Sequence, residues 1–181
     1  THTAWEDVAL IREIPGAVIC DPADDVQMEW IIKEFSKMEG IHYVRSNRKA
    51  VRNVYKKGSS FKIGQGNILK EGKDILIIAA GQLVSEALDC AEELEKEGHS
   101  VEVIDMFTIK PLDEKLLIKE AKGKSKIVTI ENHSIYGGLG SAVSEVIAEN
   151  GIPVPVKRIG VKEKFGQVGT AEFLQKEFGL T

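Results

Sequence analysis

Hydrophobic and polar residues alternate most regularly in the second part of the chain, from Asp74 onward. Short apolar runs predict buried strands, and apolar residues spaced three or four apart predict amphipathic helices. The predicted strands are residues 74–80, 101–107, 127–130 and 154–161, and the predicted helices are residues 83–97, 111–122, 139–147 and 170–178. This alternation favours a largely parallel sheet covered on both faces, so we expect a complete three-layer α/β/α domain.

The first part of the chain is less complete. Residues 17–20 and 41–44 are predicted strands, and they flank a helix that follows the capping sequence Asp21-Pro22-Ala23-Asp24 and ends at Gly40. Two strands and one long helix cannot cover both faces of a sheet. The pattern therefore predicts a partial α/β domain, completed by residues upstream of Thr1 or by another polypeptide.

The segment between these two parts has no helical period. Residues 49–72 are rich in Lys, Gly and Ser, and they are predicted to form a linker that ends in an edge strand at residues 67–69. We therefore expect the partial domain and linker over residues 1–60 and the second domain over residues 61–181.

A glycine-rich turn follows the strand predicted at residues 127–130. Gly138 and Gly140 open a helix after this strand, which is one feature of dinucleotide-binding sites because helix amino termini attract phosphate. However, Val143 occupies the third small position of that fingerprint, and too little chain follows for a two-halved nucleotide-binding sheet. The pattern favours glycines that allow a close connection between strand and helix.

Polar side chains follow two of the predicted strands. Glu131 and His133 are two residues apart and share one face of the chain, and the absence of a nucleophile beside them favours a hydrogen-bonded pair over a catalytic one. Arg45 and Arg48 follow the strand at residues 41–44, where they could bind a phosphate or carboxylate or could simply be solvated. The spacing of these two arginines leaves both interpretations open.

Composition excludes several classes of function. The 181 residues carry a formal charge of −4 with 43% hydrophobic residues, and they show no basic stripe interleaved with aromatics, which argues against nucleic-acid binding. No apolar run approaches the length of a membrane span. No pair of the four histidines has the short spacing that zinc ligands favour, so we expect no metal site. Cys20 and Cys90 are predicted to be buried free thiols in a reducing cytoplasm.

Six short motifs occur in a fixed order along the chain: Thr1-His2 with Glu6-Asp7, Asp21-Pro22-Ala23-Asp24, Arg45-Ser46-Asn47-Arg48, Thr108-Ile109-Lys110-Pro111-Leu112-Asp113, Glu131-Asn132-His133 and Gly137-Gly138-Leu139-Gly140. Together they resemble the motifs of transketolases, and the match covers essentially the whole chain. The chain is similar to the carboxyl-terminal portion of these enzymes, which is the second half of the pyrimidine-binding domain followed by the C-terminal domain. The smaller subunit of split transketolases has this layout.

The resemblance implies a thiamine-diphosphate enzyme that transfers a two-carbon ketol unit between sugar phosphates. His2 matches a catalytic histidine that contacts hydroxyl oxygens near the reacting carbons, and Arg48 matches an arginine that binds the sugar phosphate. The resemblance also implies an N-terminal transketolase subunit, or the upstream part of the same chain, as partner. The complete assembly is expected to be a homodimer or a heterotetramer.

The same resemblance indicates what this sequence lacks. The glutamate that activates the cofactor, the aromatic residue that stacks on it and the motif that binds diphosphate and magnesium all belong to parts upstream of Thr1. We therefore expect no thiamine diphosphate or Mg²⁺ on this chain alone and no activity without the partner. Two alternatives remain, a fragment of a 1-deoxyxylulose-5-phosphate synthase and a non-catalytic dimerisation or regulatory module.

Overall fold

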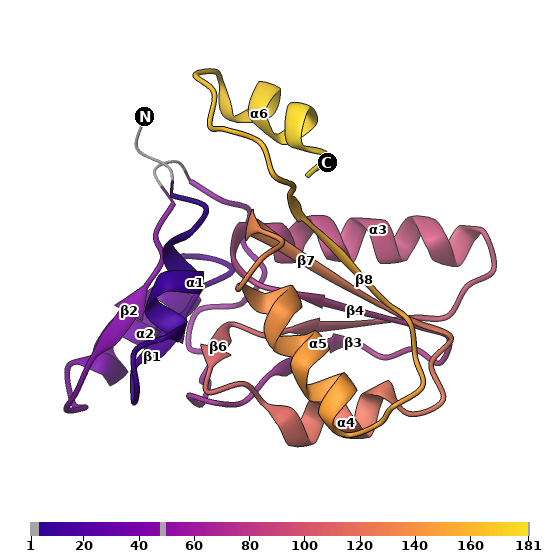
Figure 1. Ribbon diagram of the computed structural model, residues 1–181, viewed down its shortest axis with the longest axis horizontal. Coiled ribbons are helices and arrows are strands. Elements are labelled where there is room, and N and C mark those ends of the chain that lie inside the picture. Colours follow the sequence, from indigo (N-terminus) through magenta and orange to yellow (C-terminus); the bar gives the residue numbers. More distant parts are fainter. Residues whose placement is uncertain (1–3, 48–49, 181) are drawn as a thin grey trace.

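The chain builds one large and one small β-sheet. A computed structural model describes residues 4–47 and 50–180 (Figure 1). The large sheet has five strands in the order β3-β5-β4-β7-β8. Their bounds are Asn67–Lys70 for β3, Ile75–Ala79 for β4, Val101–Asp105 for β5, Lys126–Ser134 for β7 and Val156–Val161 for β8.

Most of the large sheet is parallel. Strand β4 pairs in parallel with both β5 and β7, so that Ile77 lies between Val103 and Val128. Strand β8 continues the parallel order beside β7, whereas β3 pairs antiparallel with β5 at the opposite edge. The predicted parallel sheet and the predicted edge strand are both confirmed.

Helices cover both faces of this sheet. Helix α3 (Val84–Lys96) follows the short 3-10 helix η1 (Gly81–Leu83) and shares one buried core with the chain around α6 (Ala171–Phe178). Helices α4 (Glu114–Ala121) and α5 (Leu139–Glu149) share the core of the other face. Two separate cores on the two faces of one sheet make the three layers, which confirms the predicted α/β/α fold.

The small sheet stands beside the large one and has the strand order β2-β1-β6 (Figure 1). Strands β1 (Val18–Cys20) and β2 (His42–Val44) are parallel and are accompanied by helices α1 (Asp7–Arg12) and α2 (Asp25–Phe35). The third strand, β6 (Thr108–Lys110), pairs antiparallel with β1 although it lies between β5 and α4 in the chain. The second domain therefore donates a strand to the partial one.

Four predictions from the sequence are wrong in detail. The strand predicted to reach Phe107 ends at Asp105, because the chain then crosses to the small sheet as β6. The strand predicted to end at Ile130 continues to Ser134. The helix predicted to reach Gly40 ends at Phe35. Cys90 is exposed on α3 rather than buried, whereas Cys20 is a buried free thiol as predicted.

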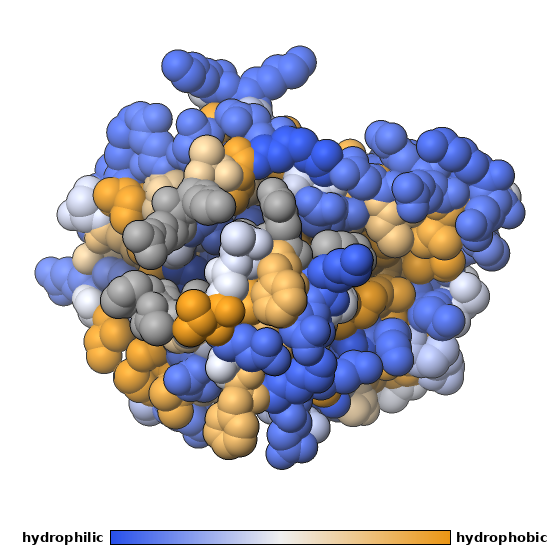
Figure 2. Space-filling view, turned by 90° about the horizontal axis from the view of Figure 1, so that it is seen from above, coloured by the Kyte–Doolittle hydropathy of each residue, from blue (hydrophilic) through white to orange (hydrophobic). Residues whose placement is uncertain are grey.

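One face of the molecule is largely polar. Figure 2 looks onto the molecule from the side on which α6 stands in Figure 1, and hydrophilic side chains dominate this face, with apolar ones in interrupted patches. None of the helices in residues 4–47 and 50–180 is long and apolar enough to cross a membrane.

Asp24 ties the start of α2 to the linker. One carboxylate oxygen, Oδ1, accepts a hydrogen bond from the backbone N–H of Gln27 at 2.9 Å, which confirms the predicted helix cap. The other oxygen, Oδ2, accepts from the N–H groups of Val54 and Tyr55 at 2.8 and 2.7 Å. The buried carboxylate of Asp24 therefore joins the linker to the start of α2.

Asp105, at the end of β5, completes this connection. Its Oδ2 accepts hydrogen bonds from the Tyr55 hydroxyl at 2.6 Å and from Nε2 of Gln27 at 2.7 Å. Burial raises the pKa of the Asp105 carboxyl from 3.8 to about 7, although the hydrogen bonds from Tyr55 and Gln27 act in the opposite direction. A carboxyl of the large sheet thus meets the small sheet in a site that favours its protonated form.

This raised pKa predicts a pH dependence of stability. Because the folded state binds the proton more tightly than the unfolded state, the contribution of Asp105 is most favourable at low pH and declines as pH rises from about 4 to about 7. The decline amounts to about 1.4 kcal/mol per pH unit, or about 4 kcal/mol in all. The substitution Asp105→Asn should remove this decline. In urea unfolding, the free energy of unfolding of the variant should therefore rise relative to that of wild type between pH 4 and pH 8.

The control for this experiment is Glu93→Gln, because Glu93 is exposed on α3 and forms no hydrogen bond or salt bridge of its side chain with any described residue. Its unfolding free energy should run parallel to that of wild type over the same range. A parallel curve for Asp105→Asn would contradict the assignment.

Candidate functional site

Two of the residues that the sequence marks for chemistry, His2 and Arg48, lie outside the described residues. Their roles therefore stay predictions. Near them in the sequence, the described residues Ala4 and Arg45 are in contact, because the Arg45 side chain donates a hydrogen bond to the carbonyl oxygen of Ala4. Arg45 directly follows β2. This junction is where the structure can be related to the predicted site.

The guanidinium group of Arg45 makes contacts with three separate parts of the chain. Its Nε donates to Oδ2 of Asp7 at 2.8 Å, and its Nη1 donates to Oδ2 of Asp21 at 3.0 Å. Nη1 also donates to the carbonyl oxygen of Asn132 at 3.0 Å, and Nη2 donates to that of Ala4 at 3.2 Å. One cation therefore joins the start of the described chain, the small sheet and the end of β7.

The charges at this junction are largely withdrawn from water. The side chains of Arg45, Asp7 and Asp21 are 12%, 11% and 7% exposed. Burial alone would lower the pKa of Arg45, but the carboxylates of Asp21 and Asp7 raise it above its ordinary value. Asp7 also accepts a hydrogen bond from the Tyr43 hydroxyl at 2.8 Å, and burial and this bond raise the pKa of Tyr43 to about 12.

Arg45 is not a solvated arginine: it binds carboxylates, as one of the two sequence interpretations allowed, but they belong to its own chain. Its guanidinium is therefore not a free anion site. A signal for the pairing was present, because Asp21 and Arg45 directly follow two neighbouring parallel strands in which Cys20 is opposite Val44. When two paired residues end neighbouring parallel strands, the side chains that come directly after them lie at the same edge of the sheet and are expected to meet.

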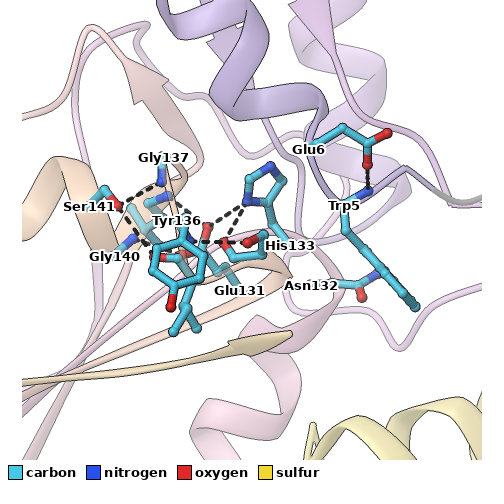
Figure 3. Close-up of polar contacts among 12 residues, drawn as sticks. Trp5, Glu6, Glu131, Asn132, His133, Tyr136, Gly137, Gly140 and Ser141 are labelled. Carbon is cyan, nitrogen blue, oxygen red and sulfur yellow. Dashed lines mark hydrogen bonds and ion pairs between the residues drawn. The ribbon is translucent and has the colours of Figure 1, made fainter. Parts of the chain in front are cut away.

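Glu131 on β7 caps the glycine-rich turn (Figure 3). Its Oε2 accepts from the backbone N–H of Leu139 at 2.7 Å, and its Oε1 accepts from that of Gly140 at 2.9 Å. Burial raises the pKa of Glu131 to about 7, and the two N–H groups act against that rise. The carboxylate therefore occupies the N-terminus of α5, the position where a dinucleotide phosphate would have to bind. This arrangement rejects the dinucleotide interpretation.

His133 lies beside this cap but does not bond to it. Its Nδ1 is 3.7 Å from Oε2 of Glu131 and 2.7 Å from the carbonyl oxygen of Ser134, to which the Nδ1-protonated tautomer donates. Burial lowers the pKa of His133 below its ordinary value, which favours the neutral ring. Glu131 and His133 are each hydrogen bonded, as predicted, but to backbone groups rather than to each other.

The motif from Thr108 to Asp113 also has structural contacts. The Nζ of Lys110 donates to the carbonyl oxygens of Arg12 and Ile14 at 2.6 and 2.7 Å, at the C-terminal end of α1. Oδ1 of Asp113 accepts from the N–H of Leu116 at 3.0 Å and so caps α4. Lys110 thus joins β6 to the end of α1, and Asp113 fixes the start of α4, so both residues have structural roles.

No metal centre emerges from this geometry. In the described parts of the chain, no group of three or more His, Cys, Asp or Glu side chains is placed to hold a metal ion.

The fold and this junction place the chain among α/β proteins in which a three-layer domain carries part of a second domain. The family description "Transketolase, C-terminal domain" matches residues 64–181. A 6-deoxy-6-sulfo-D-fructose transketolase subunit from Clostridium sp. (strain MSTE9) is 39% identical over 181 residues, which is 100% of this chain and 56% of the relative. The chain therefore belongs to the transketolase family.

The solved structures agree. A split gene transketolase, described as an inactive beta4 tetramer, has a TM-score of 0.93 and 42% identity, and the match covers 99% of this chain and 58% of that one. A 1-deoxy-D-xylulose-5-phosphate synthase from Heliobacterium modesticaldum (strain ATCC 51547 / Ice1) is 34% identical over 184 residues, covering 100% of this chain and 28% of the relative. The chain thus spans little more than half of the transketolase subunits and a smaller share of the synthase.

The cap at α5 leaves no space for a side chain at Gly138. A Cβ atom there would lie 2.0 Å from Oε2 of Glu131 and 2.6 Å from Nδ1 of His133. The φ of Gly138 is −89°, so the obstacle is steric rather than conformational. Gly138→Ala should lower the free energy of unfolding by about 1–3 kcal/mol, the usual cost of overpacking, as measured by urea denaturation.

Gly166→Ala is the matched control, because a Cβ atom at Gly166 would only touch the Trp5 ring at 3.6 Å. We expect it to change stability by less than about 0.5 kcal/mol. Equal stability of the two variants would show that the turn can yield and that the cap is not rigid.

Proposed function

We propose that this chain is the C-terminal part of a thiamine-diphosphate-dependent transketolase that transfers a two-carbon ketol unit between sugar phosphates. An N-terminal transketolase subunit, or the upstream part of the same chain, supplies the rest of the active site. Family membership and the coverage of 56–58% of the transketolase subunits support this assignment. We also propose that the chain acts in the cytoplasm.

One observation carries the proposal furthest. The guanidinium of Arg45 binds the carbonyl oxygen of Ala4 and both carboxylate oxygens of Asp7. Ala4 follows His2 by two residues, and Arg45 precedes Arg48 by three. The buried ion pair thus ties together the two short segments of chain that carry the proposed site residues.

The roles proposed for these residues follow the family resemblance. His2 contacts hydroxyl oxygens near the reacting carbons, where an imidazole that titrates near neutrality can exchange protons with substrate. Arg48 binds the sugar phosphate, since a guanidinium can donate two parallel hydrogen bonds to a phosphate.

The cofactor is proposed to bind mainly to the N-terminal subunit or to the upstream part of the chain. Thiamine diphosphate, when bound, supplies the carbanion chemistry of such enzymes. The described residues do not fit it, because Glu131 fills the N-terminus of α5 and no described carboxylate cluster suits Mg²⁺. This chain therefore contributes substrate contacts and support to the proposed site.

The small sheet offers a place for the partner. Strand β2 lies at its outer edge, and the nearby apolar residues Leu10, Ile32 and Ile41 are 64%, 50% and 50% exposed. An open strand edge flanked by exposed apolar side chains is costly in water. We infer that an upstream segment or an N-terminal subunit covers it, within a homodimer or heterotetramer.

Two alternatives are weaker. The synthase from Heliobacterium modesticaldum is less similar than the transketolase subunit from Clostridium sp., at 34% against 39% identity. A purely non-catalytic dimerisation or regulatory module would not need the Thr-His motif or the second arginine of Arg45-Ser46-Asn47-Arg48.

The direct test is an assay of ketol transfer between sugar phosphates, with and without a candidate N-terminal subunit. The chain alone should show no turnover and no saturable heat with thiamine diphosphate and Mg²⁺ in calorimetric titration. The mixture should show both binding and turnover. Tight cofactor binding by the isolated chain would contradict the split site, and an inactive but cofactor-binding mixture would favour a non-catalytic module.

Arg48→Ala tests the proposed phosphate contact. In the complete assembly it should raise the KM for phosphorylated sugars about tenfold or more, because a charge-assisted hydrogen bond contributes about 1.5–3 kcal/mol. An unphosphorylated acceptor should be nearly unaffected.

Arg52→Ala is the matched control, since Arg52 is an arginine already bound by Asp89 and by the carbonyl oxygen of Ser85 on α3. Its KM values should match those of wild type. Equal losses with phosphorylated and unphosphorylated acceptors for Arg48→Ala would assign that residue a structural role instead.

A further inference from the structure

Strand β8 forms the outer edge of the large sheet opposite β3 (Figure 1). The carbonyl oxygens of Pro155 and Val161 accept from β7 and its extension, at 2.9 and 3.0 Å. Backbone groups of alternate residues in a parallel strand point to opposite sides. Val156, Arg158 and Gly160 therefore direct their N–H and C=O groups outward, and they find no further backbone partner in the described parts of the chain.

A hollow of about 470 Å³ runs along this edge. It is bounded on one side by β8 from Lys157 to Gly160 and on the other by the last turn of α6 from Lys176 to Gly179. The chain that returns from β8 to α6 therefore stands beside the strand without pairing to it. Residues 156–159 keep solvent exposure at this edge, whereas Gly160 is buried, and the hollow gives room for a short extended segment.

Basic side chains surround the hollow. Lys157, Lys162, Lys164 and Lys176 all line it, and all four are exposed. Lys164 pairs with Glu177 at 3.2 Å, whereas the other three lysines form no salt bridge with any described residue. In a chain of net charge −4, this concentration of positive charge is a local property of the β8 edge.

We propose that the edge of β8 binds an extended acidic segment of another protein, which adds to the large sheet as a further strand. An extended peptide can match the outward N–H and C=O groups of β8, and acidic side chains can pair with the surrounding lysines. A polyanion without a peptide backbone would use only the second of these features. The inference is independent of the proposed transferase activity.

A second copy of the same strand is a poor occupant. Pairing two β8 edges would bring the lysines of one copy against those of the other, and like charges across strands destabilise the pair. Lysines on an edge strand also guard against such self-association. The charge pattern therefore selects for an acidic partner rather than for another copy of this chain.

The test uses the full chain and a fluorescent peptide of about eight residues in which Glu alternates with Val, a length typical of strands. Fluorescence anisotropy should show saturable binding that weakens as salt rises. The same peptide, methylated on alternate backbone nitrogens, keeps its charge but loses the donors of one edge. It should bind at least tenfold more weakly, and the wild-type complex should slow amide hydrogen exchange at Val156 and Arg158.

Two variants with equal change of charge locate the site. Lys157→Glu with Lys176→Glu should weaken peptide binding at least tenfold, whereas Lys115→Glu with Lys122→Glu, at exposed lysines on and just after α4, should change it less than about twofold. Equal effects of the two pairs, no binding of the acidic peptide, or equal binding of the methylated peptide would each overturn strand addition. Equal binding of inorganic polyphosphate would assign the face to general anion attraction.

Discussion

The buried ion pair of Arg45 with Asp7 and Asp21 is the interaction on which the arrangement of the two sheets depends. A cation withdrawn from water is tolerated only where carboxylates and carbonyl oxygens surround it, and Arg45 has both. Asp7 on α1 and Asp21 after β1 supply the countercharges, and Asn132 on β7 supplies a carbonyl oxygen, so the hydrogen bonds of Arg45 are complete only when all three elements are in place. The interaction therefore fixes orientation more than it contributes net stability.

A second set of contacts holds the same junction from the other side. Asp24 and Asp105 bind the linker through Tyr55, and β6 extends the small sheet with a strand from the second domain. The small sheet is thus joined to the large one by polar groups and strand pairing, while no strand of residues 4–47 and 50–180 pairs with the outer edge of β2. The proposed partner would bind at this outer edge, because the inner boundary is already fixed within the chain.

The sequence predicts the large sheet well because its central strands are buried on both faces and read as continuous apolar runs, such as Ile75–Ala79. Strand β6 could not be predicted, since Thr108–Lys110 becomes a strand only by pairing with β1, which is remote in the chain. The partners of Arg45 lie 24 and 38 residues away, so local spacing could not separate a buried ion pair from an anion site. The site residues predicted by resemblance, His2 and Arg48, rest on the sequence alone.

Amide hydrogen exchange in the Arg45→Met variant tests this account most directly. Removing the cation leaves Asp7 and Asp21 without their counterion, so protection should fall at the amides that join the small sheet to the rest of the chain, among them those of Asp21 and Gly81. Protection in β4 and β5 should match that of wild type and of the exposed-site control Arg52→Met. Unchanged protection at the joining amides, or an equal loss in β4 and β5, would contradict the claim that Arg45 fixes one sheet against the other.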